Sequence, residues 1–255
     1  MAGPGFIASV LVLSEDGGHR VVRALAKQML RFIAQRNLPA AIDFEPEDEG
    51  AQEAMQGNLW KGTKTSGGHR RLVEIARVVA TKIMSPTGYV LLHVDADRLW
   101  GERDRRPSEN IQRFFKDIRL NVERHVADLL ARQGRAAEKD AVLSRLCLLS
   151  PYYSIESWLL QNTVAAKNLS KKHRRGQHLD LFDRWERDRG LLDEVPEPKK
   201  ATCLGSGMNH ELATATYPAR AVYQAGKSFT ETIDRIKGCH DLVRALGGTA
   251  DQDPG

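Results

Sequence analysis

The sequence predicts an α/β fold in which a mostly parallel β-sheet is flanked by helices. Two near-continuous apolar runs, Phe6 to Leu13 and Tyr89 to Val94, have the length of strands buried on both faces, as in parallel sheets. Segments with apolar residues at helical spacing lie between such runs, and turns containing Gly or Pro separate them. This alternation of strand and helix is typical of βαβ units.

In chain order we predict strands at 6–13, 39–44, 89–97 and 141–149, and helices at 19–35, 69–84, 108–132 and 154–160. Gly17-Gly18 provides the turn from the first strand into the first helix. Residues 45–68 are acidic and then rich in Gly, Lys and Thr, which predicts a loop of the length that often carries function. Ser108 is a predicted N-cap, and Pro151 ends the fourth strand.

The composition changes after residue 165, where a basic stretch, a charged helical stretch and short helical segments follow one another. We therefore predict a sheet domain over residues 1–165 and a helical C-terminal elaboration over 166–246 that packs on it. Residues 247–255 form a predicted disordered tail.

The 255-residue chain has a formal net charge of +5, which is compatible with a nucleic-acid partner but does not require one. Its three cysteines are far apart in the sequence, which fits a reducing compartment better than a disulfide framework or a zinc cluster. The apolar run at 6–13 follows no Lys or Arg and is too short to cross a bilayer. We expect a cytoplasmic protein without a membrane partner.

Three acidic residues lie at the ends of two predicted strands: Glu15 at the end of the first, and Asp95 and Asp97 at the end of the third. The carboxyl ends of parallel strands meet at one edge of a sheet, where ligands of α/β proteins bind. In an extended chain, Asp95 and Asp97 would share a face about 6–7 Å apart, with Ala96 turned away. Carboxylates this close repel one another unless a cation lies between them. Mg²⁺ suits such a site; the alternative is that the aspartates only end a strand.

Glu15 with its glycine turn, and Asp95-Ala96-Asp97 at the end of a later strand, resemble the TOPRIM domain. This Rossmann-like domain is shared by topoisomerases, bacterial primases, overcoming-lysogenization-defect nucleases and small repair proteins. The resemblance implies that Glu15 acts as a metal ligand or general acid/base and that the two aspartates hold Mg²⁺ or Mn²⁺. The chain departs from the family at Asp16, where Gly is usual; Asp16 is either a fourth acid or a sign of divergence.

The segment PYYSIESWLL, from Pro151 to Leu160, is similar to one in stand-alone TOPRIM-like proteins of bacterial defence systems. That group also tends to end in a helical region. The similarity implies that Glu156 is a further catalytic acid. The alternative is that Glu156 makes only a favourable contact with the dipole of a helix in its first turn.

Together these resemblances imply a Mg²⁺-dependent nuclease that cleaves phosphodiester bonds in DNA or RNA. They imply an effector role in anti-phage defence, with an ATPase or sensor subunit as a partner. One alternative is a non-catalytic TOPRIM-like subunit that binds nucleic acid or another protein. Another is an enzyme that processes small phosphate esters at the same carboxylates.

Basic residues supply candidate contacts to a nucleic-acid backbone. Those near the predicted site are Lys64, Arg98, Arg103, Arg105 and Arg106, and a later basic run contributes Lys171, Lys172, Arg174 and Arg175. Solvated surface charge is the alternative for each. His93 lies within the third strand, and we predict a buried histidine with satisfied hydrogen bonds, in the core or near the site, and not a metal ligand.

Overall fold

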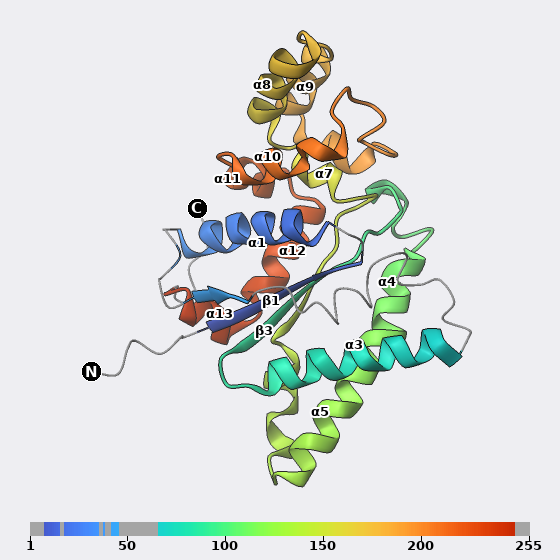
Figure 1. Ribbon diagram of the computed structural model, residues 1–255, viewed down its shortest axis with the longest axis vertical. Coiled ribbons are helices and arrows are strands. Elements are labelled where there is room, and N and C mark those ends of the chain that lie inside the picture. The colour runs from blue at the N-terminus through green and yellow to red at the C-terminus, as the bar shows by residue number, and fades with distance from the viewer. Residues whose placement is uncertain (1–7, 16–17, 36–37, 39–41, 46–65, 248–255) are drawn as a thin grey trace.

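A four-stranded, all-parallel sheet flanked by helices forms the centre of the protein (Figure 1). The computed structural model describes residues 8–15, 18–35, 38, 42–45 and 66–247. The strands are β1 (Ala8–Ser14), β2 (Ile42–Phe44), β3 (Gly88–His93) and β4 (Leu146–Leu149), and their order in the sheet is β2-β1-β3-β4. The predicted α/β class is therefore confirmed.

The sheet separates two hydrophobic cores, because successive residues of a strand point to opposite faces. On β1, Val10 and Val12 pack into one core, whereas Leu11 and Leu13 pack into the other. The first core contains α1 (His19–Ala34) and apolar residues from α7 (Glu156–Leu159) and the helices after it. The second contains α3 (Ser66–Met84) and α5 (Leu120–Arg132). Both faces of the sheet are thus covered, which explains why its strands read as continuous apolar runs.

The long helix predicted from Ser108 to residue 132 forms, but a π-helical turn interrupts it. Ser108 Oγ accepts a hydrogen bond from the backbone N–H of Ile111 at 3.2 Å, as an N-cap does. The helix consists of α4 (Glu109–Arg113), the π-helical turn η2 (Phe114–Arg119) and α5. Within it, Phe114, Ile118, Val122 and Val126 are buried against the sheet core, and this apolar stripe holds the interrupted helix together.

The fourth strand is shorter than the sequence predicts. Residues Lys139–Leu143 form helix α6, and β4 covers only Leu146–Leu149, so the prediction of strand from residue 141 is wrong. Ser144 and Arg145 break the apolar run between the two elements. Ser144 Oγ donates to the carbonyl of Ala141, and Arg145 Nη1 donates to the carbonyl of Ser85 at 2.9 Å. These two contacts favour a turn where the apolar composition alone favours strand.

Other boundaries move by smaller amounts. Helix α3 begins at Ser66, three residues before its predicted start, and α7 covers Glu156–Leu159. The remaining elements are η1 (Trp100–Glu102), η3 (Ala136–Glu138), α8 (Thr163–Arg174), α9 (Leu179–Arg187), η4 (Arg189–Glu194), η5 (Ser206–Met208), α10 (Asn209–Thr214), α11 (Ala219–Gln224), α12 (Ser228–Lys237) and α13 (His240–Ala245). The predicted boundary at residue 165 falls inside α8. The predicted tail lies outside the described residues, except for Gly247.

The C-terminal helices share a core with α1 (Figure 1). Trp158 of α7 is buried there and packs edge-on against Phe229 of α12. Its indole N–H donates to Ser228 Oγ at 2.7 Å, and the buried Asp193 accepts from both the N–H and the hydroxyl of Ser228. Across the described ranges, no helix combines the length and the apolar composition needed to cross a bilayer.

Candidate functional site

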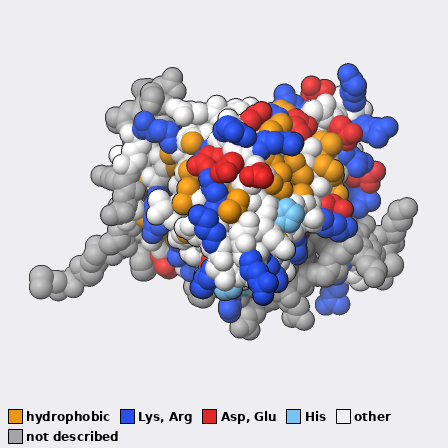
Figure 2. Space-filling model, turned by 90° about the horizontal axis from the view of Figure 1, so that it is seen from above, with side chains coloured by type: hydrophobic (Ala, Val, Ile, Leu, Met, Phe, Trp, Pro, Cys, Tyr) orange, Lys and Arg blue, Asp and Glu red, His pale blue; other side chains and the backbone are white. Residues whose placement is uncertain are grey.

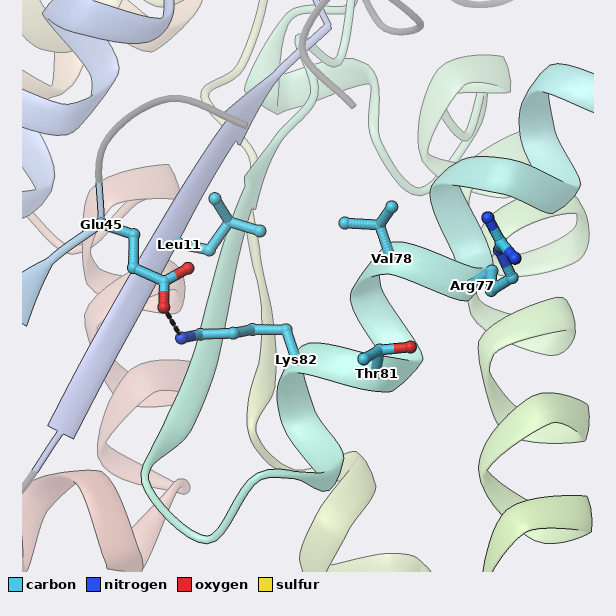
Figure 3. Close-up of a pocket in the computed structure, with 6 residues that line it drawn as sticks. All are labelled: Leu11, Glu45, Arg77, Val78, Thr81 and Lys82. Atoms are coloured by element: carbon cyan, nitrogen blue, oxygen red, sulfur yellow. Dashed lines mark hydrogen bonds and ion pairs between the residues drawn. The ribbon is translucent and has the colours of Figure 1, made fainter. Parts of the chain in front are cut away.

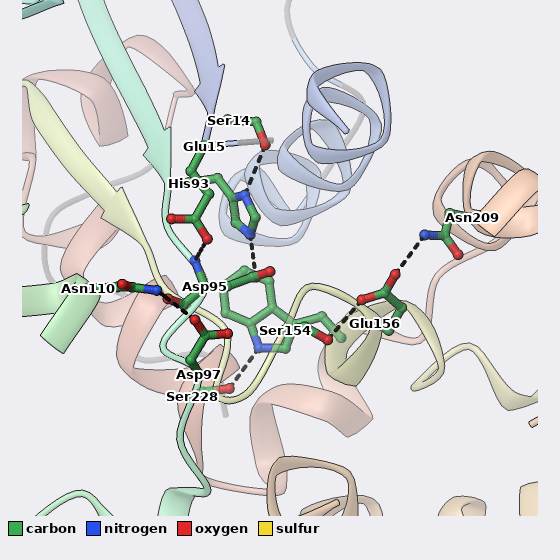
Figure 4. Close-up of polar contacts among 11 residues, drawn as sticks. Ser14, Glu15, His93, Asp95, Asp97, Asn110, Ser154, Glu156, Asn209 and Ser228 are labelled. Atoms are coloured by element: carbon green, nitrogen blue, oxygen red, sulfur yellow. Dashed lines mark hydrogen bonds and ion pairs between the residues drawn. The ribbon is translucent and has the colours of Figure 1, made fainter. Parts of the chain in front are cut away.

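Glu15 and Asp95 lie in contact at the carboxyl ends of two neighbouring strands (Figure 4). In the β1–β3 ladder, Ser14 is the register partner of His93, so the residues after these two strands leave the sheet at the same level. The backbone N–H of Asp95 donates to Glu15 Oε1 at 2.7 Å. Parallel register therefore brings together two acids that are 80 positions apart in the chain.

His93 holds the Asp95 carboxylate from inside the sheet. The His93 ring is fully buried, with Nε2 2.9 Å from Asp95 Oδ1 and Nδ1 3.0 Å from Ser14 Oγ. Because an ionised carboxylate can only accept, Nε2–H is the donor to Asp95. His93 is thus a near-site histidine with partners at both ring nitrogens, and it sets the orientation of one candidate ligand.

Asp97 is held separately, by Asn110 of α4. Asn110 Nδ2 donates to Asp97 Oδ2 at 2.8 Å and to the backbone carbonyl of Asp95 at 3.1 Å. The expectation that Asp95 and Asp97 share a face of an extended strand is wrong, because β3 ends at His93 and Asp97 has a left-handed φ of 50°. Aspartate tolerates this conformation better than most residues. Ala96 is buried, and both aspartates are accessible to solvent.

Glu156 lies apart from the Glu15–Asp95 contact. The loop after β3 runs beside the loop after β4, with Ala96 N–H donating to the Pro151 carbonyl and Asp97 N–H to that of Tyr153. Glu156 begins α7 after this loop. Its carboxylate accepts from Ser154 Oγ at 2.8 Å and from Asn209 Nδ2 at 3.1 Å, and Figure 4 shows it between these two side chains.

Two tyrosines flank the aspartate loop on its β4 side. Burial is the main cause that raises the pKa of Tyr152 and of Tyr153, and the carboxylates of Glu197 and Asp97 add to the effect at Tyr153. Both phenols are therefore protonated at neutral pH. They can donate hydrogen bonds at this edge of the sheet but cannot act as preformed phenolate nucleophiles.

The arginines after Asp97 fall into two groups. Arg98 donates to the Asp97 carbonyl at 3.3 Å, and the Arg103 guanidinium lies 4.0 Å from the centre of the Trp100 ring, so both have local structural contacts. Arg105 and Arg106 are exposed. Only the second pair has the accessibility expected of contacts to a nucleic-acid backbone.

The later basic run forms the last turn of α8 and the residue after it, where cations interact favourably with the helix dipole. Its exposed members include Lys171, Lys172 and Arg174. Figure 2, which looks onto the end of the molecule formed by α8 and α9, shows Lys and Arg side chains interspersed with Asp and Glu. Arg174 Nε donates to the Cys203 carbonyl at 3.2 Å, and Arg175, with φ of 55°, is the helix C-cap. Lys64 and Asp16 lie outside the described residues.

Two of the residues that position the acids were not predicted from the sequence. Ser14 contacts His93 from the strand before it, and Asn110 contacts both aspartates. A signal for Ser14 exists, because a polar residue inside a buried strand needs a partner. Asn110 had no such signal, since its contacts depend on the turn that the chain makes at Asp97.

The oxygen donors at this edge are of the kind that Mg²⁺ prefers, namely carboxylates from Glu15, Asp95 and Asp97. Over the described residues, no three His, Cys, Asp or Glu side chains are grouped closely enough to hold a metal ion. Mg²⁺ is commonly held by one or two carboxylates together with waters and substrate phosphates. Glu15 and Asp95 supply two carboxylates at neighbouring strand ends, and the contact between them runs through the backbone N–H of Asp95.

Comparison of the chain with protein-family models, with curated proteins and with solved structures finds no significant match.

Proposed function

We propose that this chain is a TOPRIM-like nuclease that uses Mg²⁺ or Mn²⁺ to hydrolyse phosphodiester bonds in DNA or RNA. The observation that carries the proposal is the contact between Glu15 and Asp95 across β1 and β3. These are the residues that correspond to the TOPRIM glutamate and first aspartate. Their position at the carboxyl edge of a parallel sheet is where α/β proteins bind ligands.

In this proposal, the carboxylates of Glu15 and Asp95 would hold the divalent ion, which would supply electrostatic stabilisation of the phosphate and activation of water. His93 fixes the Asp95 carboxylate by its Nε2–H, and Asn110 fixes Asp97 at the mouth of the site. In the same proposal, Glu15 also accepts a proton from the attacking water.

A second candidate is a TOPRIM-like subunit that binds nucleic acid or a protein partner without turnover. This candidate is favoured because two of the predicted acids are held by other side chains and away from Glu15. Asp97 is bonded to Asn110, and Glu156 is bonded to Ser154 and Asn209. A subunit that has lost catalytic turnover would keep the fold, but its carboxylates would not have to gather around a metal ion.

Incubation with Mg²⁺ or Mn²⁺ and a panel of plasmid DNA, single-stranded RNA and free nucleotides tests the two candidates. The nuclease proposal expects cleavage of a polymer by the wild type and none by Asp95→Ala/Asp97→Ala, with stabilisation of the wild type by the metal in a thermal-shift assay. Cleavage by the double variant at the wild-type rate would show that the assigned site is wrong. Neither cleavage nor a metal-dependent thermal shift would favour the binding subunit.

By the same resemblance, we propose that the protein acts in anti-phage defence, with an ATPase or sensor subunit that restrains or triggers it. A nuclease without restraint is toxic to its host. Expression of the wild type alone is then expected to slow growth more than expression of Asp95→Ala/Asp97→Ala at equal protein level.

A further inference from the structure

A hollow of about 490 Å³ lies where α3 crosses the long helix formed by α4, η2 and α5. We name it the basic groove, and its polar lining consists mainly of His69, Arg113, Lys116, Asp117 and Arg124. Figure 1 shows α3 crossing this long helix, with the start of α3 and α4 at the end of the sheet where β1 and β3 finish. The groove thus lies toward the same end of the sheet as the acidic site (Figure 1).

The charge in the groove is strongly unbalanced. Arg113, Lys116 and Arg124 are permanent cations at neutral pH and all three are exposed, whereas Asp117 is the single carboxylate of the lining. Throughout the described part of the chain, Lys116 and Arg124 form no ion pair, and Arg113 has only a weak one of 3.9 Å with Glu109, both side chains being well exposed. Cations gathered in a concavity with so little neutralisation by carboxylates create a positive field that concentrates anions.

The cations are also arranged in a line. They recur at spacings of three to eight residues along one face of a helix, which extends over roughly 16 Å from Arg113 to Arg124 at 1.5 Å per residue. A single small anion would occupy only part of that length. A chain of phosphates would contact all three in turn.

The groove is connected to the acidic site through the helix itself. Asn110, which donates to Asp97 Oδ2, lies about one helical turn before Arg113 on α4. The π-helical turn begins at the next residue, Phe114, and such turns are frequent at functional sites. The helix that positions Asp97 near its start therefore also carries the three cations of the basic groove further along its length.

We propose that the basic groove binds the phosphodiester backbone of a nucleic-acid strand and leads it toward Glu15 and Asp95. The proposal rests on the proposed nuclease function for the role of the bound strand, but binding in the groove is measurable without cleavage. It assigns the main backbone contacts to Lys116 and Arg124, which the sequence pattern did not single out, and not to the basic end of α8.

The test measures binding of a fluorescent single-stranded oligonucleotide by anisotropy in EDTA, where no metal-dependent cleavage occurs, over a series of salt concentrations. Lys116→Ala/Arg124→Ala is expected to raise the Kd at least about tenfold near 0.1 M salt. It is expected to reduce the slope of log K against log salt by roughly 1.4, the value for two phosphate contacts to a single strand. Lys116→Arg/Arg124→Lys keeps both charges and is expected to bind like the wild type.

The matched control is Lys199→Ala/Arg220→Ala, which removes two exposed cations outside the groove. Circular dichroism and the melting temperature establish that each variant is folded. An unchanged Kd and salt slope in the groove variant, an equal loss in the control, or no binding by the wild type would overturn the proposal. A competition assay compares inorganic phosphate with an unlabelled strand at the same total phosphate concentration. If both displace the labelled oligonucleotide equally well, the proposal is overturned, because the groove then binds single phosphates and not an extended backbone.

Cleavage is measured separately with Mg²⁺, so that the two proposals can fail independently. A wild type that binds through the groove but does not cleave supports the groove and contradicts the nuclease function. A groove variant that binds and cleaves at the wild-type level, while Asp95→Ala/Asp97→Ala does not cleave, contradicts the groove and leaves the nuclease function standing.

Discussion

Glu15 and Glu45 each follow a strand of the same parallel sheet, yet they lie in different environments. Glu15 follows β1 and accepts a hydrogen bond from Asp95 at the carboxyl edge. Glu45 follows β2, whose last residue, Phe44, is the register partner of Val10, so β2 ends partway along β1. Glu45 therefore reaches Lys82 of α3, as Figure 3 shows, and not the edge of the sheet. It also accepts a hydrogen bond from Ser9 of β1.

The comparison shows that strand register, and not the bare position after a strand, decides which acid joins a site. Glu45, Lys82 and Ser9 form a mutually bonded group beside a hollow of about 320 Å³ under α3. Its charge is neutralised inside the fold, as in a structural ion pair. Glu15 instead lies at the carboxyl edge of the sheet, where its carboxylate accepts from the backbone N–H of a second acid, Asp95.

The largest effect is expected from Glu15→Gln. The amide oxygen of Gln can still accept from the Asp95 N–H, so the change removes charge and basicity but preserves the contact. In the proposed nuclease, cleavage is expected to fall on the order of a hundred- to a thousandfold, the range for loss of one preorganised electrostatic group. Initial cleavage rates in Mg²⁺ measure this, with the melting temperature as the control for folding. Wild-type rates in a folded variant would place Glu15 with Glu45 among the structural acids.

A smaller loss is expected from His93→Phe. Phe fills the buried volume but cannot hold the Asp95 carboxylate or bond to Ser14. Loss of such an outer-shell partner typically costs about 10- to 100-fold in metal affinity or activity. The informative measurement is the Mn²⁺ concentration that half-saturates cleavage, which is expected to rise. His93→Gln retains an amide donor and is expected to recover part of the affinity. If both variants lower the maximal rate and leave metal saturation unchanged, His93 does not act by positioning Asp95.

For Glu45, the expected effect is on stability. Although burial opposes it, hydrogen bonds from Lys82 and Ser9 lower the pKa of Glu45 from its ordinary value of 4.5. A carboxyl group whose pKa is lower in the folded state stabilises the fold above its unfolded pKa, and this contribution disappears as the pH falls through the folded value. Glu45→Gln is expected to reduce the free energy of unfolding by about 1 kcal/mol at pH 7.

Urea unfolding at pH 7 and at pH 3 measures the free energy of unfolding of the wild type and of Glu45→Gln. The difference between the two free energies is expected to be smaller at pH 3. Cleavage and metal saturation are expected to match the wild type, in contrast to Glu15→Gln. A loss of cleavage in the Glu45 variant without a loss of stability would erase the distinction between the two glutamates.

Much of this arrangement could be predicted from the sequence, because parallel strands place their carboxyl ends at one edge. That rule brought Glu15 to Asp95 without knowledge of strand order. The position of Asp97 could not be predicted in the same way, because its left-handed φ and its contact with Asn110 depend on how the loop after β3 follows the loop after β4. These are long-range contacts, and no local pattern encodes them.

The same limit applies to Arg145. Within the apolar run after residue 141 it looks like an interruption of a strand, whereas in the fold its guanidinium donates to backbone carbonyls of Ile83 and Ser85. That contact ends α6 and sets the start of β4. The sequence shows that a polar residue is present, but only the fold shows that backbone carbonyls between α3 and β3 are available to accept its hydrogen bonds.

The smallest effect is expected from Glu156→Gln, which tests the acid that resemblance assigned to the site and the fold places beside Ser154 and Asn209. The amide oxygen can still accept from one partner, and this carboxylate is not held against Asp95. Cleavage is therefore expected to change by less than about threefold, within the range of a weak first-turn charge–dipole contact. Asp95→Asn is the control variant for which a large loss of cleavage is expected, because Asp95 belongs to the proposed site. A fall in cleavage with Glu156→Gln as large as that with Asp95→Asn would mean that Glu156 swings from Asn209 toward the metal when substrate binds, and that the acids converge only in the complex.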